Sequence, residues 1–248
     1  MLAEIGTETV GATSLGVLLA STAGVAVLHT LAGPDHYLPF IAMGRARRWS
    51  AARLAAWTTV CGLGHVASSV LVAVGAVSFG FGLERVELIE EFRGNLAAWA
   101  MIVFGAVYLA WGLKRAFRSR PHAHRHAHGG EAAHDHEHSH AGAHLHVHAE
   151  EAAGFSLTPW VLFTIFVLGP CEPMIPLVMY PAAQGAWAQT TGVVAVFSLL
   201  TIGAMLAAVF LAVRGIRLLP LQRIERFQHV IAGAVVLGAG SAIQFFGL

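Results

Sequence analysis

The sequence predicts an all-α membrane protein of six transmembrane helices, arranged as two inverted repeats of three helices each. Three observations predict it: an apolar composition, six hydrophobic runs of membrane-spanning length, and a Gly-Pro motif that occurs twice. Of 248 residues, 56% are hydrophobic and only 12% are charged, which is about half the charged fraction of a typical soluble domain. Most of the chain therefore has no need of contact with water.

Six hydrophobic runs approach or exceed the roughly 20 apolar residues that a hydrocarbon core of ~30 Å requires. The first run follows an acidic stretch (Glu4, Glu8) where a signal peptide would carry positive charge, so we expect no cleaved leader. Cys61 and Cys171 lie inside hydrophobic runs and do not make a disulfide framework. The expected spans are residues 13–44, 54–80, 95–113, 158–181, 190–213 and 228–247.

Basic residues predict the orientation of the chain. Thirteen of the fifteen Lys and Arg residues fall in the loops after the first, third and fifth spans, whereas Arg85 and Arg93 fall in an acidic loop between the second and third. The positive-inside rule then places both termini outside. We expect a bacterial inner membrane, and organelle membranes would give the same pattern.

One short motif occurs in both the first and the fourth hydrophobic run. Leu31–Pro39 aligns with Val167–Ile175 at an offset of 136 residues, with Gly-Pro on Gly-Pro and two polar residues after each. Three spans per half is an odd number, so the two halves must have opposite orientations, as in many secondary transporters. We expect a first repeat at 1–113, a loop at 114–157 and a second repeat at 158–248.

The repeated Gly-Pro should interrupt both helices. Proline removes a backbone donor and clashes with the preceding turn, and glycine lowers helix stability further. A break at membrane depth frees backbone carbonyls and amides, and transporters commonly place ion sites at such breaks. The first run supports this prediction, because its 32 residues would extend about 48 Å as a straight helix.

Residue types that bind metals gather around the predicted breaks. Ionisable groups at membrane depth are costly and are functional candidates by default. His29 and His36 would be about 10 Å apart on a straight helix, so they bind one ion only if the break folds them together; otherwise they mark successive stations along a path. Cys61 is expected to serve packing. The candidate metal ligands are His29, Asp35, His36, His65, Cys171 and Glu172.

The segment His29-Thr-Leu-Ala-Gly-Pro-Asp35-His36 resembles the first-helix signature of the nickel and cobalt transporter families, in which a histidine is followed by Asp-His. The importer branch has a spacing one residue shorter and a further aspartate, so the chain is more similar to the urease-accessory-like and exporter-like branch. Residues 169–176 are similar to the proline-cysteine motif of the cytochrome c biogenesis thiol-disulfide carriers, which belong to the same broad six-helix group. The resemblance implies this fold and metal-related transport.

Residues 122–148 contain eleven histidines and almost nothing aromatic or branched that could form a core. This composition predicts a disordered cytoplasmic loop. Clustered imidazoles suit Ni²⁺, Co²⁺, Cu²⁺ and Zn²⁺ alike, so the loop indicates a transition metal without selecting one. It would capture ions for export, buffer them after import or sense their level; a tolerated spacer is the alternative.

Together these features favour a membrane transporter of a divalent transition-metal ion, nickel or cobalt before zinc, copper or iron, with export slightly favoured. The ion is cargo, and we expect no tightly bound cofactor, no enzymatic activity and no nucleic-acid partner, while a homo-oligomer is left open.

Two other function classes remain. A thiol-disulfide carrier would need paired cysteines, but Asp35 stands where the first would be, which leaves Cys61 as the only mate of Cys171. A metal-binding accessory or sensor protein would need the histidine-rich loop but not the ligands inside the membrane.

Overall fold

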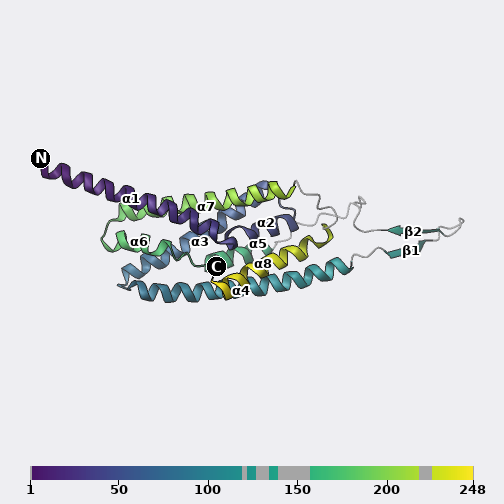
Figure 1. The fold of residues 1–248 in the computed structure, drawn as a ribbon. Helices are drawn as coiled ribbons and strands as arrows, with labels where there is room; N and C mark the ends of the chain where they lie inside the picture. The colour runs from purple at the N-terminus through teal and green to yellow at the C-terminus, as the bar shows by residue number, and fades with distance from the viewer. Residues whose placement is uncertain (1, 119–121, 127–133, 139–156, 218–224, 248) are drawn as a thin grey trace.

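The computed structural model describes residues 2–118, 122–126, 134–138, 157–217 and 225–247 (Figure 1). Long helices run side by side along the molecule, and a small hairpin extends from one end. In chain order the elements are α1 (Leu2–Ala32), the 3₁₀ turn η1 (Pro34–His36), α2 (Leu38–Ala46), α3 (Ala51–Ser78), α4 (Leu83–Arg118), β1 (His122–His126), β2 (His134–His138), α5 (Leu157–Leu168), α6 (Met174–Ala183), α7 (Trp187–Arg217) and α8 (Gln228–Phe246).

Five helices, α1, α3, α4, α7 and α8, are long and apolar enough to cross a membrane. Large apolar side chains such as Leu28, Leu71 and Leu199 are more than two-thirds exposed, which suits contact with lipid rather than water. The protein is therefore a multi-pass helical membrane protein. The expected fourth span is divided between α5 and α6, of 12 and 10 residues, which follow one another along the bundle (Figure 1).

Both predicted helix breaks are present. α1 ends at Ala32, and Gly33 leads into the single 3₁₀ turn η1 before α2 begins. α5 ends at Leu168, and residues 169–173 carry no α-helix before α6 begins at Met174. In both cases helix ends where Gly-Pro stands, because proline cannot donate the next hydrogen bond.

α4 is longer than the sequence predicted. We expected the third span at residues 95–113 and an acidic loop before it, but α4 begins at Leu83, so the loop prediction is wrong for residues 83–94. Val86, Glu90 and Ala97 are buried, and their spacing of four and seven residues places them on one face of the helix. That buried face, rather than overall polarity, accounts for the extra helical turns.

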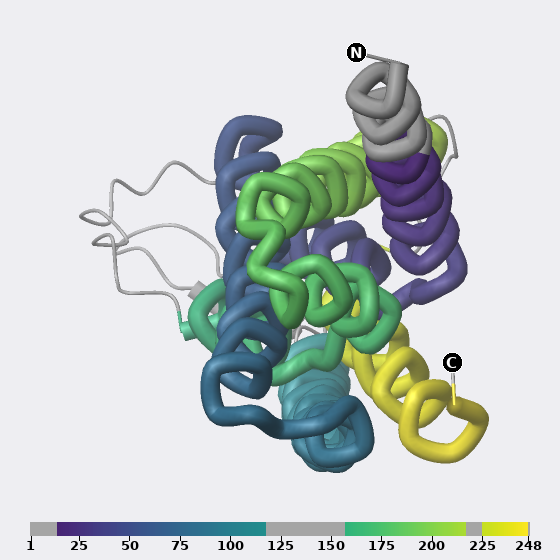
Figure 2. Tube along the Cα trace, turned by 90° about the vertical axis from the view of Figure 1, so that its left-hand side faces the viewer, coloured from purple at the N-terminus to yellow at the C-terminus, as the bar shows by residue number. Residues whose placement is uncertain are grey.

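α4 and α8 share the most extensive contact between described helices, and Figure 2 shows them side by side at one edge of the bundle. A Cβ atom added at Gly105 would overlap the backbone of Leu237, and one added at Gly233 would overlap the backbone of Leu109. Glycine thus lets the two backbones touch, as is common between membrane helices. Elsewhere α1 packs on α7, and α3 packs on α5.

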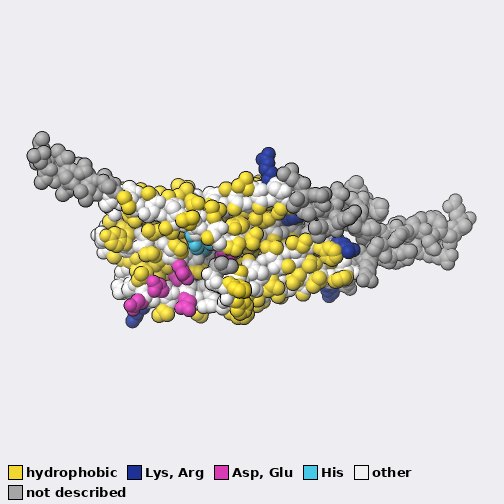
Figure 3. All heavy atoms as spheres, viewed as in Figure 1, with side chains coloured by type: hydrophobic (Ala, Val, Ile, Leu, Met, Phe, Trp, Pro, Cys, Tyr) yellow, Lys and Arg dark blue, Asp and Glu magenta, His cyan; other side chains and the backbone are white. Residues whose placement is uncertain are grey.

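Within the histidine-rich segment, β1 and β2 pair as antiparallel strands, with His124 opposite His136. The prediction of a loop without regular structure is therefore wrong for these ten residues, whose alternating sequence suits an extended backbone. The remainder of 122–148 lies outside the described residues. In Figure 3 most of the visible basic side chains lie toward the end of the bundle that carries the hairpin, and the acidic side chains lie toward the other end.

Candidate metal centre

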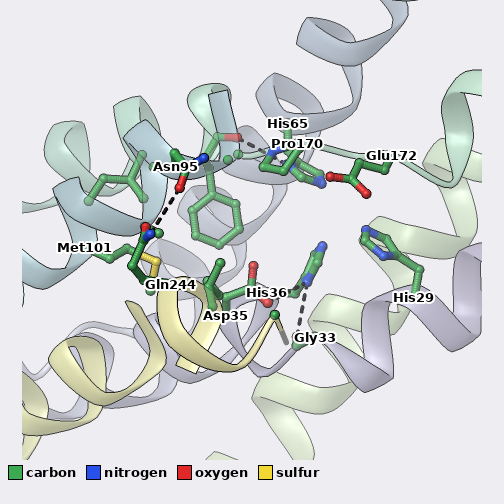
Figure 4. Close-up of a pocket in the computed structure, with 18 of the residues that line it drawn as sticks. His29, Gly33, Asp35, His36, His65, Asn95, Met101, Pro170, Glu172 and Gln244 are labelled. Carbon is green, nitrogen blue, oxygen red and sulfur yellow. Dashed lines mark hydrogen bonds and ion pairs between the residues drawn. The ribbon is translucent and has the colours of Figure 1, made fainter. Parts of the chain in front are cut away.

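A cavity of about 680 Å³ lies among α1, η1, α3, α4 and the break between α5 and α6. Its lining includes three membrane histidines, His29, His36 and His65 (Figure 4). Three carboxylates also line it: Asp35, Glu91 and Glu172. In Figure 3 a histidine side chain is visible from outside, midway along the bundle. The cavity therefore connects the interior of a membrane protein with its surface.

The three histidines converge in space although they come from different elements. The ring centroids are 4.7 Å apart for His29 and His36, 5.2 Å for His36 and His65, and 6.4 Å for His29 and His65. One nitrogen from each ring lies within 4.8 Å of the other two. The Gly33-Pro34 break thus folds His29 and His36 together, which was the condition for both to reach a single ion.

Hydrogen bonds fix the tautomers of two of these rings. His36 Nδ1 lies 3.1 Å from Gly33 O, and His65 Nδ1 lies 3.2 Å from Phe166 O. A carbonyl oxygen only accepts, so each Nδ1 carries a proton, and in the neutral ring Nε2 then keeps the lone pair. Both Nε2 atoms are buried and have no hydrogen-bond partner among the described residues.

An unpaired nitrogen in a membrane protein is costly, so these two atoms need an explanation. Imidazoles that bind a metal through one nitrogen usually donate the other N–H to a carbonyl or carboxylate, which fixes the ring. His36 and His65 have this arrangement. Three imidazole nitrogens can therefore hold one metal ion at this position.

The remaining predicted ligands lie around the three histidines. Asp35 Oδ1 is 3.2 Å from His36 Nδ1, so the carboxylate orients the His36 ring. Cys171 Sγ is 3.7 Å from His29 Nε2, and Cys171 is fully buried. The exposed Glu172 lines the cavity and extends into it from the side opposite Asp35 (Figure 4).

The two cysteines occupy different parts of the core. Cys171 packs in a cluster with Ala26 and Phe197, whereas Cys61 packs in another with Phe40 and Met205. Both thiols are free. Neither cysteine is among the residues that line the cavity, and of the two only Cys171 lies against one of the three histidines.

Sequence reasoning missed two groups of polar residues near the site. Glu90 and Arg93 were placed in a loop, yet they form an ion pair inside the bundle next to the second break. Asn95 Oδ1 accepts a hydrogen bond of 3.1 Å from Gln244 Nε2, which joins α4 and α8 at the cavity wall. The three-residue spacing of Glu90 and Arg93, in register with Val86 and Ala97, was the available signal.

Fold and site together define a multi-pass helical membrane protein with a buried group of three histidines that can hold a metal ion. No protein family, curated protein or solved structure matches the chain.

Proposed function

We propose that the protein transports a divalent transition-metal ion across a membrane, with nickel or cobalt as the first candidates and zinc, copper or iron as alternatives. One observation carries the proposal: the Nε2 atoms of His36 and His65 are buried and bond to none of the described residues, each Nδ1 faces a carbonyl oxygen, and His29 lies within reach of both. Imidazole nitrogen suits these metals, whereas magnesium and calcium prefer oxygen ligands.

The surroundings of the histidines support transport rather than permanent storage. The site lies at two helix breaks, where transporters commonly bind ions, and an open cavity leads to it. Asp35 and Glu172 add negative charge along the cavity that favours entry of a cation.

Topology is part of the proposal. We place the two halves as inverted repeats, because α1 packs on α7 while the corresponding α5 packs on α3. The basic residues favour termini outside and a cytoplasmic histidine-rich loop in a bacterial inner membrane. A chelating segment on that side favours export, since it would collect ions before they reach the cavity.

The test is metal flux into liposomes that contain the purified protein. Ni²⁺ and Co²⁺ should cross with the unaltered chain and cross more than about 100-fold more slowly when His29, His36 and His65 are all replaced by alanine, beyond the loss typical for residues that only support a ligand. His229→Ala is the matched control, because His229 is a membrane-helix histidine bonded to Tyr108 instead of lining the cavity. Equal flux in all three proteins would overturn the proposal.

A thiol-disulfide carrier is the second candidate, because Cys171 lies against His29 at the site. Such a carrier would lose thiol-disulfide exchange in Cys171→Ser and keep much of it in His36→Ala. The transporter predicts the opposite order for metal flux. Exchange that depends on Cys171, with no metal flux in the unaltered chain, would replace the transport proposal; metal binding without flux or exchange would indicate an accessory or sensor protein.

A further inference from the structure

The first turns of α4 carry a buried ion pair that the metal site does not use directly. Glu90 is fully buried and pairs with Arg93 one turn later on the same helix. Neither residue lines the cavity. Two charges inside a membrane protein are costly to desolvate and are retained only where further hydrogen bonds satisfy them. The partners of this pair therefore indicate its role.

Arg93 donates to the backbone at the end of α5. Its guanidinium lies 2.9 Å from Val167 O and 3.4 Å from Gly169 O, and 2.7 Å from Ser68 Oγ on α3. The last carbonyls of a helix have no partner within it. Gly169 O has a further reason to lack one, because Pro173, four residues later, has no N–H.

Glu90 accepts from the backbone on the other side of the same break. Its carboxylate lies 3.3 Å from Cys171 N and 3.4 Å from Ser69 Oγ. In a continuous helix the Cys171 N–H would donate to Val167 O, four residues earlier. Here the ion pair replaces that bond, because Arg93 donates to the carbonyl of Val167 and Glu90 accepts from the amide of Cys171.

We propose that Glu90 and Arg93 are positioning residues that hold the second helix break open and thereby place two parts of the metal site. One part is Cys171, whose Sγ then lies 3.7 Å from His29 Nε2. The other is Phe166 O, which accepts from His65 Nδ1 at 3.2 Å and so fixes the tautomer of that ring. This inference rests on the proposed function only for its effect on metal affinity.

Close packing supports this role of α4. A Cβ atom added at Gly94 would lie 3.0 Å from Pro170 Cγ, so the helix lies directly against the break. α4 thus contacts the residues of the break both through the ion pair and through van der Waals contact. None of the backbone N–H groups of residues 169–173 is described as donating to Val167 O, so Arg93 is its described donor.

The experiment uses the full chain with Cys61→Ala, which leaves Cys171 as the single thiol. Two quantities are measured in detergent: the rate at which a maleimide labels Cys171, and the Co²⁺ concentration that protects Cys171 by half. Protection reports on metal bound beside Cys171, at His29, and is insensitive to metal held by the histidine-rich segment. Arg93→Gln and Glu90→Gln should each speed labelling and raise the protecting Co²⁺ concentration by about 10- to 100-fold, as for other residues that orient metal ligands.

Controls on the same helix are Arg85→Gln and Glu87→Gln, which change exposed residues and should leave both quantities unaltered. Arg93→Lys keeps the charge but has one nitrogen in place of the two that bond Glu90 and the carbonyls of Val167 and Gly169, so it should give an intermediate result. If a glutamine variant fails to fold, Arg93→Lys decides the question by itself. Labelling and protection that match the controls in Arg93→Lys and in every folded glutamine variant would overturn the inference.

The two readouts also separate this inference from the transport proposal. Labelling of Cys171 requires no metal. Faster labelling in the variants, combined with no Co²⁺ protection even in the parent protein, would retain the positioning role and reject the metal site. Unaltered labelling in the variants, combined with strong Co²⁺ protection in all of them, would do the reverse.

Discussion

The two helix breaks share a Gly-Pro motif but satisfy their backbones in different ways. At the first break the partners are local: Gly33 O accepts from both the backbone N and the side-chain Nδ1 of His36, each at 3.1 Å. At the second break they come from another helix, since Arg93 and Glu90 of α4 bond the carbonyl of Val167 and the amide of Cys171.

This difference indicates a division of labour. The residue that satisfies the first break, His36, is also a candidate ligand, so backbone geometry and metal binding depend on one side chain. The second break is satisfied by an ion pair outside the cavity, which leaves Cys171 free to contact His29 and Glu172 free to line the cavity. The first break should therefore tolerate substitution much less well than the second.

The largest effect expected from this comparison is that of ligand removal. His36→Ala removes a ring nitrogen and the partner of Gly33 O together, so Co²⁺ flux in liposomes should fall more than about 100-fold, beyond the loss typical for residues that only support a ligand. Cys171→Ser keeps size and polarity, so flux should stay within about tenfold or shift in metal preference. Equal losses of flux in both variants would contradict this division of labour between the two breaks.

The matched pair Gly33→Ala and Gly169→Ala sharpens the comparison. A Cβ atom at Gly33 would lie 2.6 Å from His36 Nδ1, whereas the nearest atom to one at Gly169 is Phe166 O at 3.3 Å. Gly33 has φ −87°, which alanine adopts freely, so its effect is steric. Displacing His36 from its rotamer costs about 1 kcal/mol, so flux should fall roughly fivefold to tenfold in Gly33→Ala and change little in Gly169→Ala. A reversed order would show that the second break sets the ligands.

A smaller effect is expected for Asp35→Asn. The amide keeps the shape and can still accept from His36 Nδ1, but the negative charge that raises the basicity of the ring is lost. Co²⁺ affinity, measured by protection of Cys171 from maleimide, should fall severalfold and less than about tenfold. Glu91→Gln is the control, since Glu91 is an exposed carboxylate at the cavity; a similar loss there would point to general charge rather than to the His36 ring.

The smallest effect on metal flux is expected from replacing the histidine-rich segment. Replacing residues 122–148 by a Gly-Ser linker of equal length removes eleven histidines without touching either break. Total bound metal should decrease, while flux at saturating Co²⁺ should change by less than about twofold, because the described strands of the segment, β1 and β2, lie outside the bundle (Figure 1). A large loss of flux at saturation would place the segment in the transport step itself, and unchanged metal binding and flux at every concentration would leave it a spacer.

Much of the geometry of the first break could be predicted from the sequence, but little of that of the second. Gly33-Pro34 predicted the interruption, and the spacing of His29 and His36 showed what the interruption had to achieve, because all of these residues are local. Contacts of the second break join Val167 and Cys171 to residues more than seventy positions earlier. No local sequence pattern predicts which distant residues pair in this way. The acidic composition around Glu90 predicted a loop, although one face of this segment is a buried helix face.

His65 illustrates the same limit from another direction. Its residue type and its place in a hydrophobic run made it a candidate, but its partner, Phe166 O, lies 101 positions away on α5. The carbonyl belongs to a residue with an apolar side chain, which offers no signal in the sequence. Which of its two nitrogens faces the cavity could therefore be learned only from the fold.

The interlocked glycines of α4 and α8 restrict how the molecule can move. Because the backbones approach closely at Gly105 and at Gly233, we expect the two helices to move together as a single rigid body. Arg93 attaches the second break to that body, and Phe166 O carries His65 with it. His29 and His36 belong to α1 and η1 instead. A rocking motion of α1 and η1 relative to α4 and α8 would separate His29 and His36 from His65. The ion would then lose its ligands and be released.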